Sequence, residues 1–269
     1  GVSRKKRENY LFCIIPGFQT PAWSKGAVMY QILVDRFYNG DPTNDVETNE
    51  YIYIGSPVQR VSDWEELPEN LDVGRFYGGD LKGVWNKLDY LKSLGVECIY
   101  LNPVFVSPSN HKYDCQDYEH IDPHYGVIAE DLDLLVDPND MDNDMAGKYA
   151  TRTADMTNLK ASDDFFAAFV EAAHEKGIRV IVDGVFNHCG SFNKWLDAEE
   201  IYKNSGDYEP GAYETKDSPY HSFFQFHDER DQAWPCNATY DGWWGHDTLP
   251  KLNYENSGKL VEYILNVAK

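Results

Sequence analysis

Asp183 and His188 are the side chains in this sequence best placed to do chemistry. They lie in the stretch IVDGVFNH, where Asp183 closes an apolar run and His188 follows shortly after it. A carboxylate and an imidazole this close can hydrogen-bond the hydroxyl groups of a ligand, or they can ligate a metal ion together with further His or Asp residues. The pattern by itself has an ordinary alternative, in which Asp183 caps a turn and His188 is a hydrogen-bonded surface histidine.

Two loops bent by Gly and Pro carry oxygen-bearing side chains at alternating and adjacent positions. The candidate metal ligands in them are Asn39, Asp41, Asn44 and Asp45 in NGDPTND, and Gly78 and Asp80 in YGGD. Hard oxygen donors in irregular loops suit Ca²⁺, which takes about six to eight of them. We therefore expect calcium here, with an Asx turn that holds no metal as the alternative.

A second acidic stretch contains Asp137, Asp140, Asp142 and Asp144. It lacks the Gly and the final Glu that an EF-hand loop requires, so we expect it to be a solvated loop. Most of the aromatic residues are expected in the core, and only the neighbourhood 243–253 is expected to line a cleft.

The elements that position these residues follow one repeated pattern, in which an amphipathic helix is followed by Gly and then by an apolar strand. In the first copy, Asp80 caps a helix that Gly95 ends, and the strand 96–101 leads to Asn102. Continuously apolar strands after helices are typical of parallel α/β structure, because such strands are buried on both faces.

The second copy of the pattern leads directly to Asp183. Ser162 is expected to cap its helix, Gly177 ends it, and the strand is 178–182. An earlier strand is expected at 28–34 and a last helix at 257–268. Three strands are too few for a complete (β/α)₈ barrel, so the chain is either an open α/β layer with large loops or the first part of a larger barrel.

Several motifs resemble the α-amylase superfamily, glycoside hydrolase family 13. They are IVDGVFNH, AVMYQILVDRFYNGDPTND, GVECIYLNPVF, HKYDCQDYEHIDPHYG and LPKLN, in family-like order and spacing. The amino-acid sequence of these motifs is most similar to that of the neopullulanase, cyclomaltodextrinase and maltogenic amylase branch. The resemblance implies an α/β fold, with about three strands of a (β/α)₈ TIM barrel plus the inserted domain B, and not a complete barrel.

The resemblance also implies roles for individual residues. Asp183 and His188 would hydrogen-bond the sugar at the cleavage point, and Tyr113 would be the aromatic platform beneath it, with His111 and Asp117 nearby. These residue types suit a pyranose, because its C–H face can stack on an aromatic ring and its hydroxyl groups can hydrogen-bond to carboxylate and imidazole. The calcium ligands named above match those of similar proteins.

The catalytic groups of such a retaining enzyme would be an Asp nucleophile and a Glu acid/base. The resemblance places the nucleophile in a GxRxD motif after Lys269, so we expect no catalytic residue in this chain and no activity from the chain alone. The parent would act on starch, cyclodextrin or pullulan. The alternative is a non-catalytic, amylase-like carbohydrate-binding or partner protein.

Four segments are expected along the chain. These are a linker at 1–25, the first three β/α units of the barrel at 26–183, domain B at 184–253, and at 254–269 a helix that leads toward a fourth strand. Exposed barrel edges would allow self-association.

The charge of the chain argues against polyanionic partners. It has 24 Lys and Arg residues against 45 Asp and Glu residues, a net charge of -21 that repels nucleic acid and anionic membrane surfaces. No apolar run is long enough to span a membrane. We expect a cytoplasmic location, or an extracellular one if a signal was removed.

Overall fold

The computed structural model describes residues 16–139, 142–203, 205–229 and 237–269. The first 15 residues of the expected linker lie outside this range, as does Asp140 of the second acidic stretch.

The centre of the fold is a three-stranded parallel sheet in the order β1 (Met29–Ile32), β6 (Cys98–Leu101) and β9 (Arg179–Val182). All three expected strands are confirmed, and their order makes β6 the middle strand. The described residues form no closed barrel. Only β6 is largely buried, whereas β1 and β9 are more exposed, so the expectation of burial on both faces fails at the two edges.

The strand register brings three strand ends together. Ile32 pairs with Leu101, and Leu101 pairs with Val182, so the carboxyl ends of β1, β6 and β9 form one row. The segments that follow these strands therefore leave the sheet at the same edge, and Asp183 is among them.

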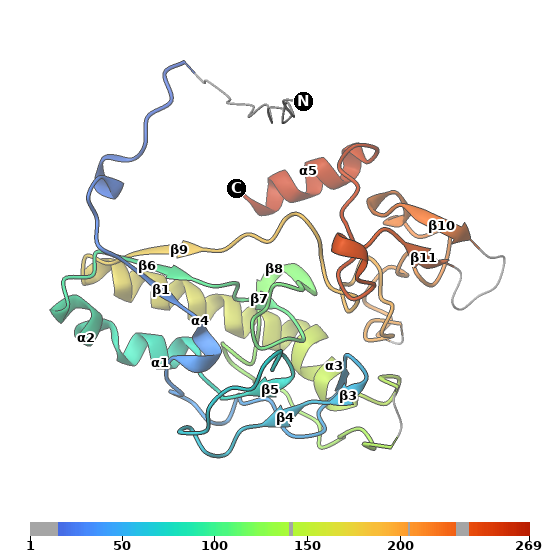
Figure 1. The fold of residues 1–269 in the computed structure, drawn as a ribbon, viewed down its shortest axis with the longest axis horizontal. Helices are drawn as coiled ribbons and strands as arrows, with labels where there is room; N and C mark the ends of the chain where they lie inside the picture. The colour runs from blue at the N-terminus through green and yellow to red at the C-terminus, as the bar shows by residue number, and fades with distance from the viewer. Residues whose placement is uncertain (1–15, 140–141, 204, 230–236) are drawn as a thin grey trace, which may run out of the picture.

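Helices α1 (Leu81–Asn86), α2 (Leu88–Ser93) and α4 (Met156–Glu175) lie on one side of the sheet in Figure 1. Their apolar positions and those of the strands form one core, which contains Ile32, Leu81, Leu88, Leu101 and Phe169. The single helix expected after Asp80 is divided at Lys87, whose N–H donates to Val84 three residues earlier and tightens the turn. None of the described helices has the length and apolarity to cross a membrane.

Helix α4 begins earlier than expected. Asp155 is its N-cap and accepts a hydrogen bond from the Thr157 N–H at 2.7 Å. The predicted cap, Ser162, lies inside the helix instead, where its hydroxyl donates to the Asn158 carbonyl and accepts from the Val127 N–H. A serine bonded in this way fits a helix interior, so its residue type alone was misleading.

The remaining elements are short, and the longest of them is the ten-residue helix α5 (Gly258–Val267). They are β2 (Ile52–Tyr53), β3 (Ser56–Pro57), β4 (Gln59–Arg60), β5 (Arg75–Phe76), β7 (Phe105–Val106), β8 (Asp117–Ile121), α3 (Gly147–Ala154), β10 (Phe226–Glu229), β11 (Asn237–Tyr240), α5 (Gly258–Val267), and 3₁₀ turns at Ala22–Ser24, Val34–Arg36, His221–Phe223 and Trp243–Gly245. The expected last helix is confirmed as α5, with Ser257 as its cap. Two further buried clusters lie outside the sheet core, around Tyr149 and around Trp195.

We predict that Asp155→Ala lowers the free energy of unfolding by about 1 kcal/mol, because the first turn of α4 loses its capping acceptor. Denaturant melts would measure the change. Asp155→Asn keeps a capping oxygen and should be close to wild type, and Asp164→Ala, on an exposed position of α4, is the control for helix propensity. Equal stability of Asp155→Ala and Asp155→Asn would contradict the assignment.

Candidate functional site

Tyr113 and Asp183 meet at the carboxyl edge of the sheet. Asp183 directly follows β9, and Tyr113 lies in the loop between the antiparallel strands β7 and β8. The Tyr113 hydroxyl donates to Asp183 Oδ2 at 3.0 Å. Burial raises the pKa of Tyr113 to about 12, with the hydrogen bond to Asp183 and the charge of Asp183 adding to the effect. The phenol therefore stays protonated and remains a donor at neutral pH.

His188 also contacts the loop that carries Tyr113. Its Nε2 lies 3.0 Å from the Tyr113 carbonyl oxygen, which can only accept, so this nitrogen carries the proton. Its Nδ1 lies 3.1 Å from the Asn187 amide nitrogen, a donor. Both contacts are satisfied by a neutral imidazole. Burial is the main cause that lowers the pKa of His188, which agrees with a neutral ring.

His111 stands beside Tyr113 and fixes its backbone. The His111 Nδ1 accepts from the Tyr113 N–H at 3.1 Å, and Ser109 Oγ lies 3.2 Å from the same nitrogen. The structure therefore brings His111, Tyr113, Asp183 and His188 into one cluster, which we call the Tyr113 cluster.

Asp117 is not brought into the Tyr113 cluster. It begins β8, is 1% exposed, and accepts from Lys194 Nζ at 2.8 Å. The Asp117 charge helps to raise the pKa of Lys194 despite the opposing effect of burial. This buried ion pair joins β8 to the segment after His188, which is a positioning role.

Two aromatic residues support the cluster: Tyr118, which was not singled out from the sequence, and Trp243, which begins the stretch 243–253 expected to line a cleft. The Tyr118 hydroxyl donates to the carbonyls of Val185 and His188, at 2.8 and 2.6 Å. The Trp243 ring stacks on His188 with centroids 4.6 Å apart and planes 9° apart. Burial does not alternate along β8, so no periodic pattern in the sequence marks either residue.

A polar pocket of about 220 Å³ adjoins the cluster. Its lining includes Asn187, Asp241, Lys251 and Asn253. Lys251 forms a β-bridge with His188, so the LPKLN stretch lies against the cluster.

The candidate calcium ligands of NGDPTND and YGGD also lie close together. Asn39 Nδ2 donates to Asp45 Oδ1 at 2.7 Å, and a Cβ added to Gly78 would lie 2.4 Å from that same oxygen. Gly78 has φ +81°, so glycine is needed both for the backbone and for this close approach. Asp80 Oδ2 accepts from the Asp41 N–H at 2.7 Å, which ties the two loops together.

Two oxygens in this group, Asn39 Oδ1 and Asn44 Oδ1, are buried without a hydrogen-bond donor. Asp45 Oδ2 is in ion-pair contact with Arg60. Burial raises the pKa values of Asp45 and Asp80 to about 6 each. Buried oxygens without donors are costly, and a cation would satisfy them.

Two further features of these loops decide which oxygens could hold a cation. The Asp41 carboxylate accepts from the N–H and the hydroxyl of Thr43, so an Asx turn is present at that residue. Within the described ranges, no three His, Cys, Asp or Glu side chains are grouped so as to hold a metal ion. A cation here would therefore depend on amide and carbonyl oxygens as well as carboxylates.

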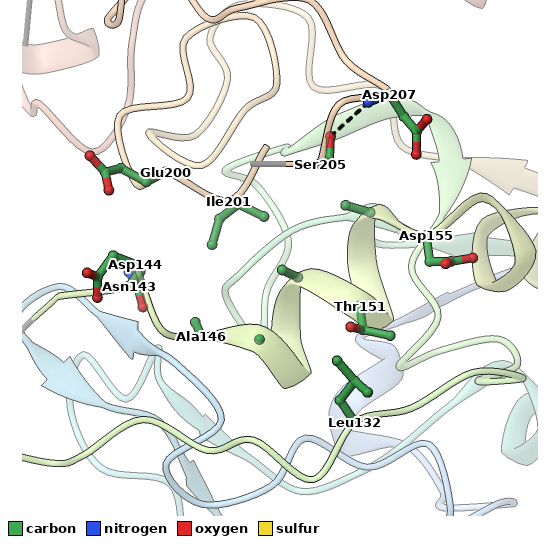
Figure 2. A pocket seen from close by; sticks show the side chains of 13 residues that line it. Leu132, Asn143, Asp144, Ala146, Thr151, Asp155, Glu200, Ile201, Ser205 and Asp207 are labelled. Atoms are coloured by element: carbon green, nitrogen blue, oxygen red, sulfur yellow. Dashed lines mark hydrogen bonds between the residues drawn. The ribbon is translucent and has the colours of Figure 1, made fainter. Parts of the chain in front are cut away.

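Another pocket, of about 360 Å³, is shown in Figure 2. It lies between α3 and the stretch from Glu200 to Asp207. Asp144 of the second acidic stretch is on its rim, as is Asp155, the cap of α4. It contains none of the predicted site residues, and it is separate from the Tyr113 cluster.

The sequence and the fold of this chain are similar to those of known proteins. Residues 31–145 and 155–269 match the sequence profile of the α-amylase catalytic domain. The chain is 38% identical to an amylopullulanase of Thermoanaerobacter thermohydrosulfuricus over 92% of its own length and 15% of that protein. It is 34% identical to an intracellular maltogenic amylase of Bacillus subtilis (strain 168), over 93% of the chain and 32% of that protein.

Among solved structures, the chain resembles the type III pullulan hydrolase from Thermococcus kodakarensis. The TM-score is 0.65 at 31% identity, and the match covers 94% of the chain and 37% of that structure. The chain thus spans well under half the length of each of these relatives.

We predict that the imidazole of His188 titrates below its usual pKa. As the pH falls from 7 to 5, the unfolded chain takes up this proton before the folded chain does, so protonation favours unfolding. Wild type should therefore lose stability relative to His188→Gln over this range, and ¹H–¹⁵N imidazole spectra should show the neutral Nε2–H form at pH 7. A pKa of His188 at or above about 6.5 would contradict the prediction.

Proposed function

Because this chain belongs to the α-amylase catalytic-domain family, we propose that it forms the substrate-holding part of an α-glucan hydrolase or transglycosidase. The observation that carries the proposal is the hydrogen bond between Tyr113 and Asp183 at the sheet edge. It places an aromatic face beside a carboxylate, which is the combination that a pyranose requires.

In this proposal each residue of the Tyr113 cluster has one task. Tyr113 offers its ring to the C–H face of a glucosyl unit, and Asp183 accepts hydrogen bonds from its hydroxyl groups. His188 fixes Tyr113 through the carbonyl contact, and its two ring nitrogens are both engaged within the protein. His111 supports the Tyr113 backbone. Asp117 has no place in this contact, since it is paired with Lys194.

Cleavage needs a nucleophilic carboxylate and a second carboxyl group that first protonates the leaving oxygen. We place both in residues that follow Lys269, in keeping with the absence of a GxRxD motif from the sequence. Residues that hold the substrate equally well in the ground state and the transition state do not raise kcat. This chain by itself should therefore bind α-glucan without cleaving it.

We also propose self-association and a cytoplasmic location. Strands β1 and β9 each pair with only one neighbour within the described residues, and an unpaired strand edge can pair with another chain. Cys98, Cys115 and Cys189 are buried free thiols, which suits a reducing compartment.

We predict that the chain binds maltohexaose weakly, with a dissociation constant on the order of 1 mM, or about -4 kcal/mol. NMR titration would measure the constant. Tyr113→Ala and Asp183→Ala should each weaken binding several-fold, whereas Tyr113→Phe keeps the ring and should lose less. Tyr90→Ala, at an exposed tyrosine of α2, is the matched control. Unchanged affinity in both alanine variants would exclude the proposed contact.

A calcium ion is the cofactor that we propose for the two acidic loops. Asn39, Asn44, Asp45 and Asp80 would hold it through side chains and Gly78 through its carbonyl, with Asp41 at the rim. The buried oxygens without donors support the proposal. The ion would be structural, since it would join the loop after β1 to the start of α1.

Calcium should raise the melting temperature of the chain relative to a chelator, because an ion that binds only the folded state stabilises it. At a hundredfold excess over its dissociation constant the gain is about 2.7 kcal/mol. Asp45→Ala should abolish the difference, and Asp142→Ala, in the exposed second acidic stretch, should leave it intact. Identical melts with calcium and with chelator would rule out the site.

A further inference from the structure

Trp244 ends a stack of three rings that starts at the Tyr113 cluster. His188 stacks on Trp243, and Trp243 stacks on Trp244 with centroids 4.2 Å apart and planes 17° apart. The exposed fraction rises from 4% at His188 to 79% at Trp244. The stack therefore runs from a buried imidazole to an indole whose outer face is open to solvent.

The backbone holds Trp244 in an unusual conformation. Its φ and ψ are 54° and 21°, a left-handed geometry that is unfavourable for a bulky side chain. The turn around it is tightly fixed. The Trp243 N–H donates to the Leu249 carbonyl at 2.8 Å, and a Cβ added to Gly242 would lie 2.0 Å from the His246 carbonyl oxygen. The strain at Trp244 is thus maintained by a rigid turn.

Folding stability gives little reason for a tryptophan at this position. Trp244 belongs to none of the three buried clusters, and most of its surface remains in water. A turn residue with this φ would ordinarily be Gly or Asn, which adopt it at lower cost. A strained and exposed aromatic residue beside a candidate binding site indicates a role in recognition.

We propose that Trp244 is a second sugar-stacking surface, which binds a glucosyl unit of the same α-glucan chain beyond the one held by Tyr113. This inference rests on the proposed function and extends it to substrate length. The outer indole face suits the C–H face of a pyranose. The polar pocket on the same segment, lined by Asp241, Lys251 and Asn253 among others, offers partners for the hydroxyl groups.

The test compares dissociation constants for maltohexaose and maltose, measured by NMR titration of the full chain. Trp244→Ala should weaken maltohexaose binding roughly three- to tenfold, in the range expected for one aromatic stacking contact. Maltose binding should change by less than twofold, because a disaccharide occupies the Tyr113 contact alone. Trp244→Phe keeps an aromatic face and should restore most of the affinity. Trp64→Ala removes another exposed tryptophan and is the matched control.

A purely structural role for Trp244 predicts the reverse pattern. In that case Trp244→Gly would lower the melting temperature and leave maltohexaose affinity unchanged, which would overturn the inference. If Trp244 instead stacks on the sugar, Trp244→Gly should bind maltohexaose weakly and melt at or above the wild-type temperature, since glycine relieves the strained φ. Failure of the unchanged chain to bind any maltooligosaccharide would contradict the proposed function itself. Loss of binding in Tyr113→Ala but not in Trp244→Ala would contradict only the role of Trp244.

Discussion

The buried ion pair between Lys112 and Asp122 is the interaction on which the candidate site depends. Lys112 lies between His111 and Tyr113, is 1% exposed, and places its ammonium 2.6 Å from Asp122 and 3.0 Å from the Ser107 carbonyl. Burial alone would raise the pKa of Asp122, but the Lys112 charge and the hydrogen bond from His124 outweigh it and hold this pKa far below its usual range. Loss of Asp122 would leave the buried Lys112 ammonium without its carboxylate partner, at a cost of about 3–5 kcal/mol. The loop that carries Tyr113 is therefore fixed from inside the protein.

The same ion pair belongs to a longer network that joins the sheet body to its loops. His124 bridges Asp122 Oδ1 and Glu50 Oε1, at 2.9 and 2.7 Å, and Arg152 donates to Glu50 at 2.8 Å. Arg152 also donates to the carbonyl of Asp45, one of the proposed calcium ligands. The two candidate sites are thus connected by one buried network of ion pairs and hydrogen bonds, although they lie on different loops. A chain with a net charge of -21 needs such cations inside, because its buried carboxylates otherwise repel one another.

Sequence reasoning succeeded where local patterns and tertiary structure agree. Continuous apolar runs located all three strands, and the one-sided apolar pattern of 257–268 located α5. It failed where a long-range contact decided the outcome. Ser162 is bonded to Val127 across the fold and so lies within α4, and Asp117 is neutralised by Lys194, which no spacing rule connects to it. The ring stack at Trp244 depends on a turn closed against Leu249, so its geometry has no periodic signal in the sequence.

His188 connects the parts of the site, since it has a different partner in each direction. Its Nε2 holds the Tyr113 carbonyl, its own carbonyl accepts from Tyr118, and its ring face carries Trp243. The Nδ1 contact with Asn187 requires a neutral ring, and burial favours that form. A charged imidazole would carry a proton on Nδ1 and would turn the Asn187 amide donor away. The Asn187 contact therefore depends on the protonation state of His188, whereas the Nε2–H contact with the Tyr113 carbonyl is available to the neutral and to the charged ring.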